Sequence, residues 1–257
     1  MKLIFDHTLG KQQDTDLVFC KPLAEVPHDE ENEALDTGWL ALDAPINGEE
    51  LFYQSRSTRI NLEGWEPRFK EWKVEDEELR LKEIEANEMV KLLGLPKIYK
   101  DYMKRKGFKQ EYDPFTHMSR RDAFILFYTK TMTNILGFTK IKKYMYQEDA
   151  FADDDGDFDE AMWAGYESVI HCNKLPISQM TLDMEIKWAK DHDAQYYYMG
   201  SGYEKSSIYK SHWSGFEWWT GSTWSRSKKL YQKLCRSDSR VTTLQDVAKI
   251  PSLLHHT

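Results

Sequence analysis

The chain has 257 residues, of which 40% are hydrophobic and 30% charged, enough to bury the core of one large α/β domain or two small ones. Its net charge of −8 argues against a generally basic nucleic-acid binder, although a local basic patch is compatible with it. No apolar run approaches the roughly 20 residues that span a bilayer. The three cysteines have no close spacing, so we expect free thiols in a reducing cytoplasm and no metal site.

The first part of the chain, residues 1–74, is predicted to be a small β-containing segment. Short strands are expected at 2–5 and 16–20. A hairpin is predicted over 39–60, with a turn at 45–48 that contains the Asn-Gly pair typical of tight hairpins.

Two helices are predicted next. Residues 75–95 place Leu79, Ile84 and Val90 against Glu and Lys, and a second helix covers 96–106. The second helix carries a basic face of Lys97, Lys100, Lys104, Arg105 and Lys106. This face is either a patch that contacts RNA or an ordinary solvated helix surface.

A strand pair is predicted at 122–130 and 135–146, and a further strand at 161–172. Between them lies the strongly acidic run 148–160. A calcium loop would need an oxygen ligand at its first position, where Phe151 would stand if Gly156 were the central glycine. We therefore expect a solvated loop and no metal.

Residues 175–224 are predicted to form a helix, a strand and a glycine- and aromatic-rich segment that turns back. Leu182, Ile186 and Ala189 form an apolar stripe, and Ser178 or Thr181 is expected to cap the helix. A buried strand is predicted at 196–199. The expected organisation is a domain over 75–236 and a tail over 237–257, with a short helix at 244–249.

The run EIKWAKDHDAQYYYMGSGYEKSSIYK, residues 185–210, resembles the C-terminal signature of arginyl/leucyl-tRNA–protein transferases. Looser matches lie at 34–60, 98–114 and 121–141. The resemblance implies a GNAT-like acyl-CoA N-acyltransferase fold, of mixed α+β or α/β class, with a mainly antiparallel sheet flanked by helices. The chain departs from the family in lacking its N-terminal cysteine cluster and in having 104–107, Lys-Arg-Lys-Gly, in place of an Arg-His pair.

The resemblance also implies a donor site where two central strands diverge, between 161–172 and 195–200. Such enzymes align an amine with an ester or thioester carbonyl while a base takes the amine proton. The candidate catalytic residues are Glu167, Tyr203 and Tyr209. The candidate donor-binding residues are Tyr198, Gly200, Gly202, Lys210, Trp213 and Trp218.

Each candidate has a second interpretation. Glu167 is either a buried base or an edge-facing carboxylate, and the tyrosines either act on the donor or pack. Lys210 either contacts a phosphate or tRNA end or is a surface lysine. The tryptophans either stack on a base or fill the core.

The leading hypothesis is an aminoacyltransferase that passes an aminoacyl group from charged tRNA to an amine of a protein or peptide. Aminoacyl-tRNA is then a co-substrate, and no cofactor, membrane or DNA partner is expected. One alternative is an N-acetyltransferase that uses acetyl-CoA, although the glycine-rich pyrophosphate loop of that class is missing before Met180. Another is a non-catalytic binding protein on the same fold.

Overall fold

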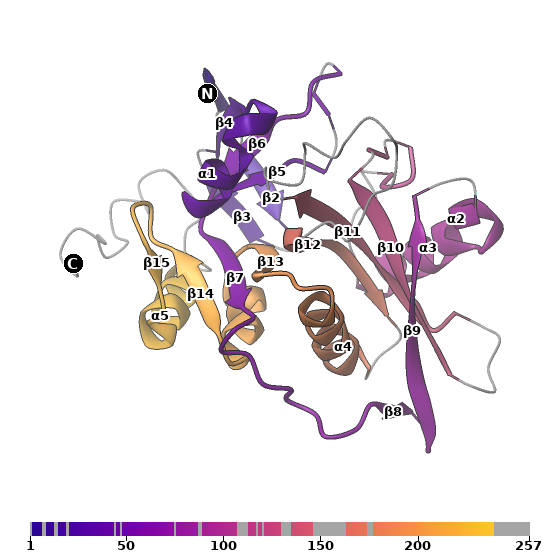
Figure 1. Ribbon diagram of the computed structural model, residues 1–257. Helices are drawn as coiled ribbons and strands as arrows, with labels where there is room; N and C mark the ends of the chain where they lie inside the picture. The colour runs from indigo at the N-terminus through magenta and orange to yellow at the C-terminus, as the bar shows by residue number, and fades with distance from the viewer. Residues whose placement is uncertain are drawn as a thin grey trace. The chain divides into compact units, whose positions relative to one another are not determined.

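The computed structural model describes residues 2–6, 9–12, 15–18, 21–43, 45–46, 48–74, 76–86, 89–106, 113–116, 118–119, 121–129, 135–145, 163–173 and 177–238. In these ranges no helix combines the length and the apolar character that a membrane span requires. The chain divides into two compact units, one of Met1–Gly64 with Met199–Thr257 and the other of Trp65–Tyr198 (Figure 1). The bounds of these units differ from those of the predicted segments 1–74, 75–236 and 237–257. The division into those three segments stays a prediction.

The Trp65–Tyr198 unit is built on a mainly antiparallel sheet flanked by helices, which confirms the predicted mixed fold class. Its strands pair in the order β13-β12-β11-β10-β9-β8, and only β12 and β13 run parallel. The strands are β8 (Lys73–Val74), β9 (Glu77–Glu85), β10 (Asp122–Thr129), β11 (Gly137–Met145), β12 (Trp163–Asn173) and the start of β13 (Tyr196–Ser201).

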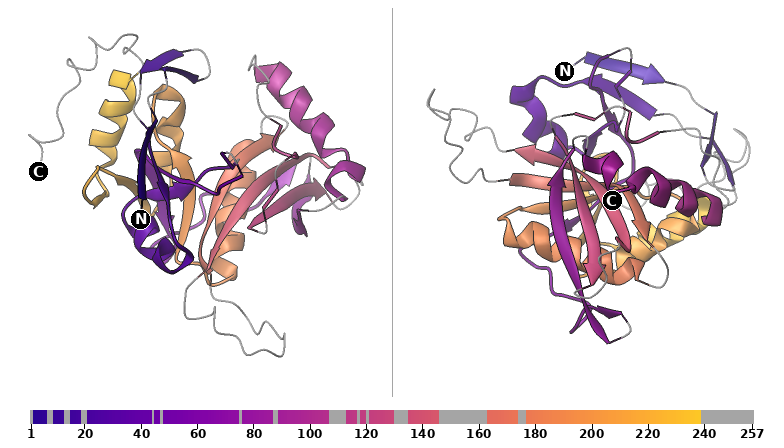
Figure 2. Two further views of the ribbon diagram at one scale, coloured as in Figure 1. Left: turned by 90° about the horizontal axis from the view of Figure 1, so that it is seen from above. Right: turned by 90° about the vertical axis from the view of Figure 1, so that its right-hand side faces the viewer.

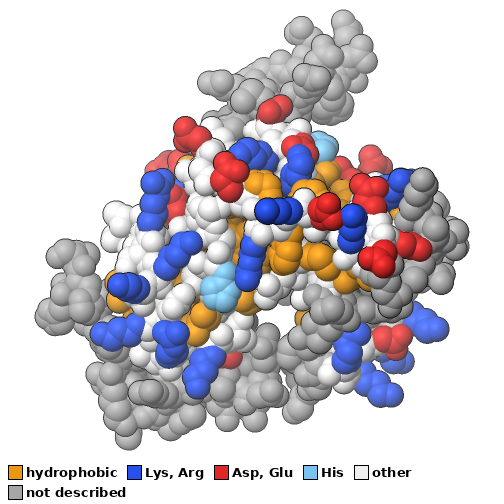
Figure 3. Space-filling view, turned by 90° about the horizontal axis from the view of Figure 1, so that it is seen from below, with side chains coloured by type: hydrophobic (Ala, Val, Ile, Leu, Met, Phe, Trp, Pro, Cys, Tyr) orange, Lys and Arg blue, Asp and Glu red, His pale blue; other side chains and the backbone are white. Residues whose placement is uncertain are grey.

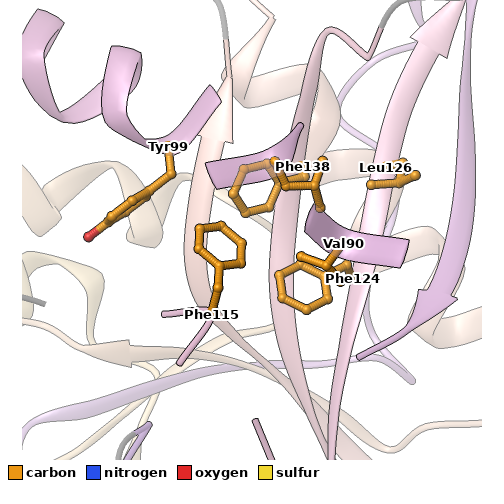
Figure 4. Close-up of a cluster of buried hydrophobic side chains, with 7 residues drawn as sticks. Val90, Tyr99, Phe115, Phe124, Leu126 and Phe138 are labelled. Carbon is orange, nitrogen blue, oxygen red and sulfur yellow. The ribbon is translucent and has the colours of Figure 1, made fainter. Parts of the chain in front are cut away.

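Helices cover both faces of this sheet (Figure 2). On one face lie α2 (Met89–Leu92) and α3 (Leu95–Lys106), above an apolar cluster that includes Tyr99, Phe115 and Phe124 (Figure 4). The rings of Phe115 and Phe124 stack with their centroids 5.9 Å apart. This cluster explains why α3 forms where the sequence predicts a helix: its apolar side is buried, and Lys97, Lys100 and Lys104 are left outside.

The other face is covered by α4 (Ser178–Asp191), which connects β12 to β13. Ile186 and Ala189 are fully buried, which confirms the predicted apolar stripe. The predicted cap is wrong, because the N-cap position is held by Ile177 and makes no side-chain hydrogen bond there. The Thr181 hydroxyl donates instead to the carbonyl of Ser178, within the first turn.

The Met1–Gly64 and Met199–Thr257 unit contains one antiparallel sheet in the order β1-β4-β6-β5, a β2-β3 hairpin, and strands in the order β15-β14-β7-β13. Its strands are β1 (Lys2–Asp6), β2 (Leu9–Gln12), β3 (Thr15–Val18), β4 (Lys21–Glu25), β5 (Trp39–Ala41), β6 (Phe52–Gln54), β7 (Ser57–Asn61), β14 (Phe216–Trp219) and β15 (Trp224–Ser225). Its helices are η1 (His28–Glu30), α1 (Glu31–Asp36), η3 (Lys205–His212) and α5 (Lys228–Asp238). The last three residues of β13 belong to this unit.

Some predicted elements are wrong. The helix predicted at 75–95 is mostly the strand β9, whose residues from Leu79 to Glu85 pair with β10. Pairing with an apolar neighbouring strand overrides the helix propensity of its Leu, Glu and Lys residues. The hairpin predicted over 39–60 is confirmed only for β5 and β6, since β7 pairs with β14 instead.

The predicted strands at 122–130, 135–146, 161–172 and 196–199 are confirmed as β10 to β13. The acidic run 148–160 and the short helix predicted at 244–249 lie outside the described residues. The helix α5 was not predicted.

Candidate functional site

Among the described strands of the Trp65–Tyr198 unit, the one parallel pair, β12 with β13, lies at the position that the resemblance implies for the donor. Gly165, Tyr166 and Glu167 of β12 pair with Tyr196, Tyr197 and Tyr198 of β13. Beyond these three pairs β12 continues to Asn173 as the partner of β11. The backbone of Glu167 is therefore placed at the last parallel pair. Its side chain is outside what the structure describes, so its catalytic role stays a prediction.

Tyr198 is a core residue of the Trp65–Tyr198 unit, with only 1% of its surface exposed. Its ring contacts Tyr144 edge-on, with centroids 5.9 Å apart. It also lies over Gly165, where an added Cβ would come within 2.7 Å of the ring. Tyr198 therefore packs between β11 and β12 in the core. Its contact with a donor stays a prediction.

A buried carboxylate links α4, the helix between β12 and β13, to the strands β11 and β13. Glu185 of α4 is 0% exposed and accepts hydrogen bonds from the hydroxyls of Thr139, at 2.7 Å, and Tyr197. The sequence did not predict this role for Glu185. The available signal was its position, because Glu185 falls between Leu182 and Ala189 on the apolar stripe, where a charged residue needs buried partners.

Asp183 of α4 has a different function, as an anchor. Its carboxylate accepts hydrogen bonds from the backbone N–H groups of Arg68 and Phe69 and from the indole N–H of Trp72, at 3.0 to 3.2 Å. These bonds hold the extended segment before β8 against the helix. The sequence pattern did not indicate this anchoring role for Asp183.

Two lysines of β11 are buried beside one carboxylate. Nζ of Lys142 lies 3.1 Å from Asp122 Oδ1, and Nζ of Lys140 lies 3.3 Å from Oδ2 of the same residue. The carbonyl of Pro114 accepts a further hydrogen bond from Lys140. All three side chains are almost fully buried, so this group lies inside the unit rather than at a site that faces solvent.

In the other unit, hydrogen bonds to backbone groups hold the end of β13. The Thr58 hydroxyl donates to the carbonyl of Gly200, and the N–H of Gly202 donates to the carbonyl of Arg56, both at 2.8 Å. An added Cβ on Gly202 would come within 2.5 Å of the Tyr231 hydroxyl and 2.7 Å of Thr58. Gly202 therefore permits close packing of the chain itself. Its predicted approach to a donor has no support in these contacts.

Tyr203 follows directly and is held by Arg56. The backbone N–H of Arg56 donates to the phenol oxygen at 3.0 Å, and the guanidinium carbon lies 4.8 Å from the ring centroid. Burial raises the pKa of Tyr203, although the nearby Arg56 opposes this shift. The phenol is therefore protonated at neutral pH, and it can act as a hydrogen-bond or proton donor rather than as a base.

Lys210 is not a surface lysine. It is only 8% exposed, and its ammonium group donates to the carbonyls of Met199 and of Ser201, the latter at 2.6 Å. These bonds tie η3 back to the end of β13. The predicted contact with a phosphate or a tRNA end stays untested, but the position of Lys210 indicates that it holds the strand in place.

The aromatic candidates divide into buried and exposed residues. Trp213 and Trp218 are buried to 1% and 0% exposure, which matches the core-filling interpretation rather than stacking on a ligand. Tyr209 is 40% exposed and contacts Trp213 edge-on at 6.2 Å. Among the aromatic site candidates of this unit, which are Tyr203, Tyr209, Trp213 and Trp218, only the catalytic candidate Tyr209 is exposed.

The described residues contain no group of three or more His, Cys, Asp or Glu side chains that could hold a metal ion. Within the Met1–Gly64 and Met199–Thr257 unit, the structure brings Gly200, Gly202, Tyr203 and Lys210 together at the end of β13.

No family model matches this chain, and no curated protein matches it. Among solved structures it is similar to the crystal structure of the C-terminal domain of a putative lysylphosphatidylglycerol synthetase from Agrobacterium fabrum. The sequence identity is 6% and the TM-score 0.39, over 71% of this chain and 54% of that chain. The chain thus spans about half of the length of that structure.

Proposed function

We propose that this chain is an aminoacyltransferase that moves an aminoacyl group from a charged tRNA to an amine of a protein or peptide. One observation supports this most. The run 185–210, which carries the resemblance to aminoacyl-tRNA–protein transferases, occupies most of α4, β13 and η3. The connection through α4 pairs β12 and β13 in parallel, whereas the other described strand pairs of the Trp65–Tyr198 unit are antiparallel. A mixed sheet with this crossover is the fold that the resemblance implies.

The proposed reaction is an aminolysis of an ester. The amine nitrogen attacks the carbonyl carbon of the aminoacyl ester, so a C–N bond forms while the bond from that carbon to the ribose oxygen breaks. The amine gives up a proton to a base, and the ribose oxygen of the tRNA takes a proton as it leaves. We propose Glu167 as the base, because its backbone lies at the last parallel pair.

Tyr203 is proposed as the group that donates a proton or hydrogen bond to the leaving oxygen. Its oxygen accepts the Arg56 N–H, so its own hydrogen is available to another acceptor. Lys210 is proposed as a positioning residue, because its ammonium group fixes the carbonyls of β13 on either side of Gly200.

Binding of charged and deacylated tRNA tests the donor. At about 50 mM salt, where phosphate contacts are strongest, filter binding is expected to retain both forms, with tighter binding of the charged form because only it carries the aminoacyl group. Equal retention of the two forms would show that the aminoacyl group is not recognised. No retention of either would contradict the proposal.

A second candidate is an N-acetyltransferase that uses acetyl-CoA. It is favoured by the start of α4, where no side chain of the N-cap residue bonds the first backbone N–H groups, and such N–H groups can bind a pyrophosphate. A rise in the unfolding temperature with acetyl-CoA, but none with charged tRNA, would favour this candidate.

A further inference from the structure

Acidic and basic side chains are segregated in the part of the chain from Glu204 to Asp238. Its three carboxylates, Glu204, Glu217 and Asp238, are buried to 6%, 5% and 4% exposure. Glu217 is paired with Arg59 and Arg226, and Asp238 with Arg56. Six cations of the same stretch are exposed, and we call them the basic face: Lys205, Arg226, Lys228, Lys229, Lys233 and Arg236.

The basic face is a surface of two elements that pack together. The Tyr231 hydroxyl of α5 donates to the carbonyl of Ser207 in η3 at 3.0 Å, and the Gln232 amide donates to the Ser211 hydroxyl at 2.9 Å. In the view from below, Lys and Arg side chains gather over the part of the molecule where α5 lies (Figure 3). A concentration of positive charge on a chain of net charge −8 indicates a local site for a polyanion.

The spacing of these cations suits a chain of phosphates. Lys229, Lys233 and Arg236 stand at i, i+4 and i+7 of α5, so they share one side of the helix and span about 10 Å along its axis. One exposed aromatic ring accompanies them, since Tyr209 of η3 is 40% exposed. Cations that follow a backbone beside a ring on which a base can stack are the features of single-stranded nucleic-acid sites.

A membrane surface fits these observations less well. An amphipathic helix that binds lipid inserts its apolar side into the bilayer. The apolar side of α5 is already occupied, because Tyr231, Leu234 and Cys235 are at most 1% exposed in the core of the unit. The exposed residues of α5 are Lys228, Lys229, Lys233 and Arg236, whereas Leu230, Gln232 and Ser237 are half-buried.

We propose that the basic face of α5 and η3, together with Tyr209, is a docking surface for single-stranded RNA. The choice of RNA as the polyanion rests on the proposed function, in which the donor is a charged tRNA. The cations contact phosphates, and Tyr209 stacks on an unpaired base.

Charge reversal tests the surface. The variant K229E/K233E/R236E changes three exposed side chains of α5, and K97E/K100E/K104E makes the same charge change on α3, the other basic helix face that the sequence leaves open as an RNA contact. The α3 variant is therefore both the control for charge and the test of the competing surface. The probes are deacylated tRNA and a 12-nucleotide single-stranded RNA, titrated at several salt concentrations. The α5 variant is expected to bind at least tenfold more weakly and to reduce the salt slope by about 2, at about 0.7 per lost phosphate contact. The α3 control is expected to stay within twofold of wild type.

Two further variants separate charge from stacking and from misfolding. K229Q/K233Q/R236Q, which introduces no repulsion, should still weaken binding and reduce the salt slope. Y209A should weaken binding of the short RNA about tenfold with an unchanged salt slope, because it removes a ring and no charge. Unchanged binding by the α5 variants, or an equal loss in the α3 control, would overturn the proposal.

Three more outcomes separate the competing partner, the docking surface and the proposed function. Binding to vesicles of equal phosphatidylglycerol and phosphatidylcholine that depends on α5, without RNA binding, would overturn the proposal in favour of a membrane. RNA binding is measured with deacylated tRNA and the 12-nucleotide RNA, so it does not depend on transfer of an aminoacyl group. A wild-type protein that binds RNA through α5 but transfers no aminoacyl group would overturn only the proposed function. A transferase whose α5 variants bind RNA normally would overturn only the docking surface.

Discussion

Arg56 and Asp238 are separated by 182 residues in the chain, and their side chains form an ion pair with Nη1 and Oδ2 2.5 Å apart. The pair is mostly buried, and Asp238 also accepts the backbone N–H of Glu204. The same arginine holds Tyr203 through its backbone N–H. The ion pair therefore links α5 to the residues that follow β13.

Replacement of Asp238 by alanine is expected to lower the free energy of unfolding by about 3 kcal/mol, because the Arg56 charge would remain buried without its carboxylate. Denaturant unfolding measures the change. The matched control is Asp191→Ala, which breaks the exposed ion pair with Lys187 and should cost at most about 0.5 kcal/mol. Equal costs for the two variants would show that the Arg56–Asp238 pair is not effectively buried.

Stability is expected to fall at alkaline pH. Burial raises the pKa of the Cys235 thiol above its ordinary value of 9.0, and burial also raises the pKa of Tyr203 above 10.0. Between the unfolded and folded pKa values the native state binds more protons, so the stability present below pH 9 is lost as the pH rises through that interval. Urea unfolding from neutral to alkaline pH should show this decline, and Cys235→Ser and Tyr203→Phe should each make it shallower. A decline of the same steepness in both variants would assign it to other groups.

Tyr197→Phe is expected to destabilise the protein by about 1 to 3 kcal/mol, because the buried carboxylate of Glu185 loses one of its hydroxyl donors. Thr139→Val removes the second donor. The two losses should not be additive, since both hydroxyls bond the same carboxylate. Strict additivity in a double-mutant cycle would indicate that the two bonds act independently.

Gly202→Ala is expected to cost about 1 to 3 kcal/mol, because its Cβ would lie within 2.7 Å of both Tyr231 and Thr58. Gly64→Ala is the control, since nothing lies within 4 Å of the position of its Cβ. Combining Gly202→Ala with Tyr231→Phe should recover part of the loss by removing the closest atom. Equal stability of the two alanine variants would contradict the close packing at Gly202.

The sequence predicted those elements whose own residue pattern shows which side chains are buried. The apolar stripe of α4 repeats at the helical period, and the tyrosine run of β13 is a short continuous apolar run, so both are visible in a single sequence. The strand β9 was missed because Glu, Leu and Lys favour a helix locally, and only the ladder with β10 makes it a strand.

The candidate site was predicted less well because it depends on contacts between distant residues. No local pattern shows that Lys210 folds back onto the carbonyls of Met199 and Ser201, or that Gly202 accommodates Tyr231. The burial of Trp213 and Trp218 follows from packing of the whole unit, so sequence alone left both core filling and ligand stacking open.

Transfer of a labelled amino acid tests the central claim most directly. The protein is incubated with tRNA charged with a radiolabelled amino acid and with a peptide that has a free N-terminal amine. If an amide bond forms, the peptide carries label that remains after treatment with mild alkali. The same treatment hydrolyses the ester of unreacted charged tRNA. No alkali-stable label above the level of a protein-free control, with any amino acid of a full charged set, would contradict the account.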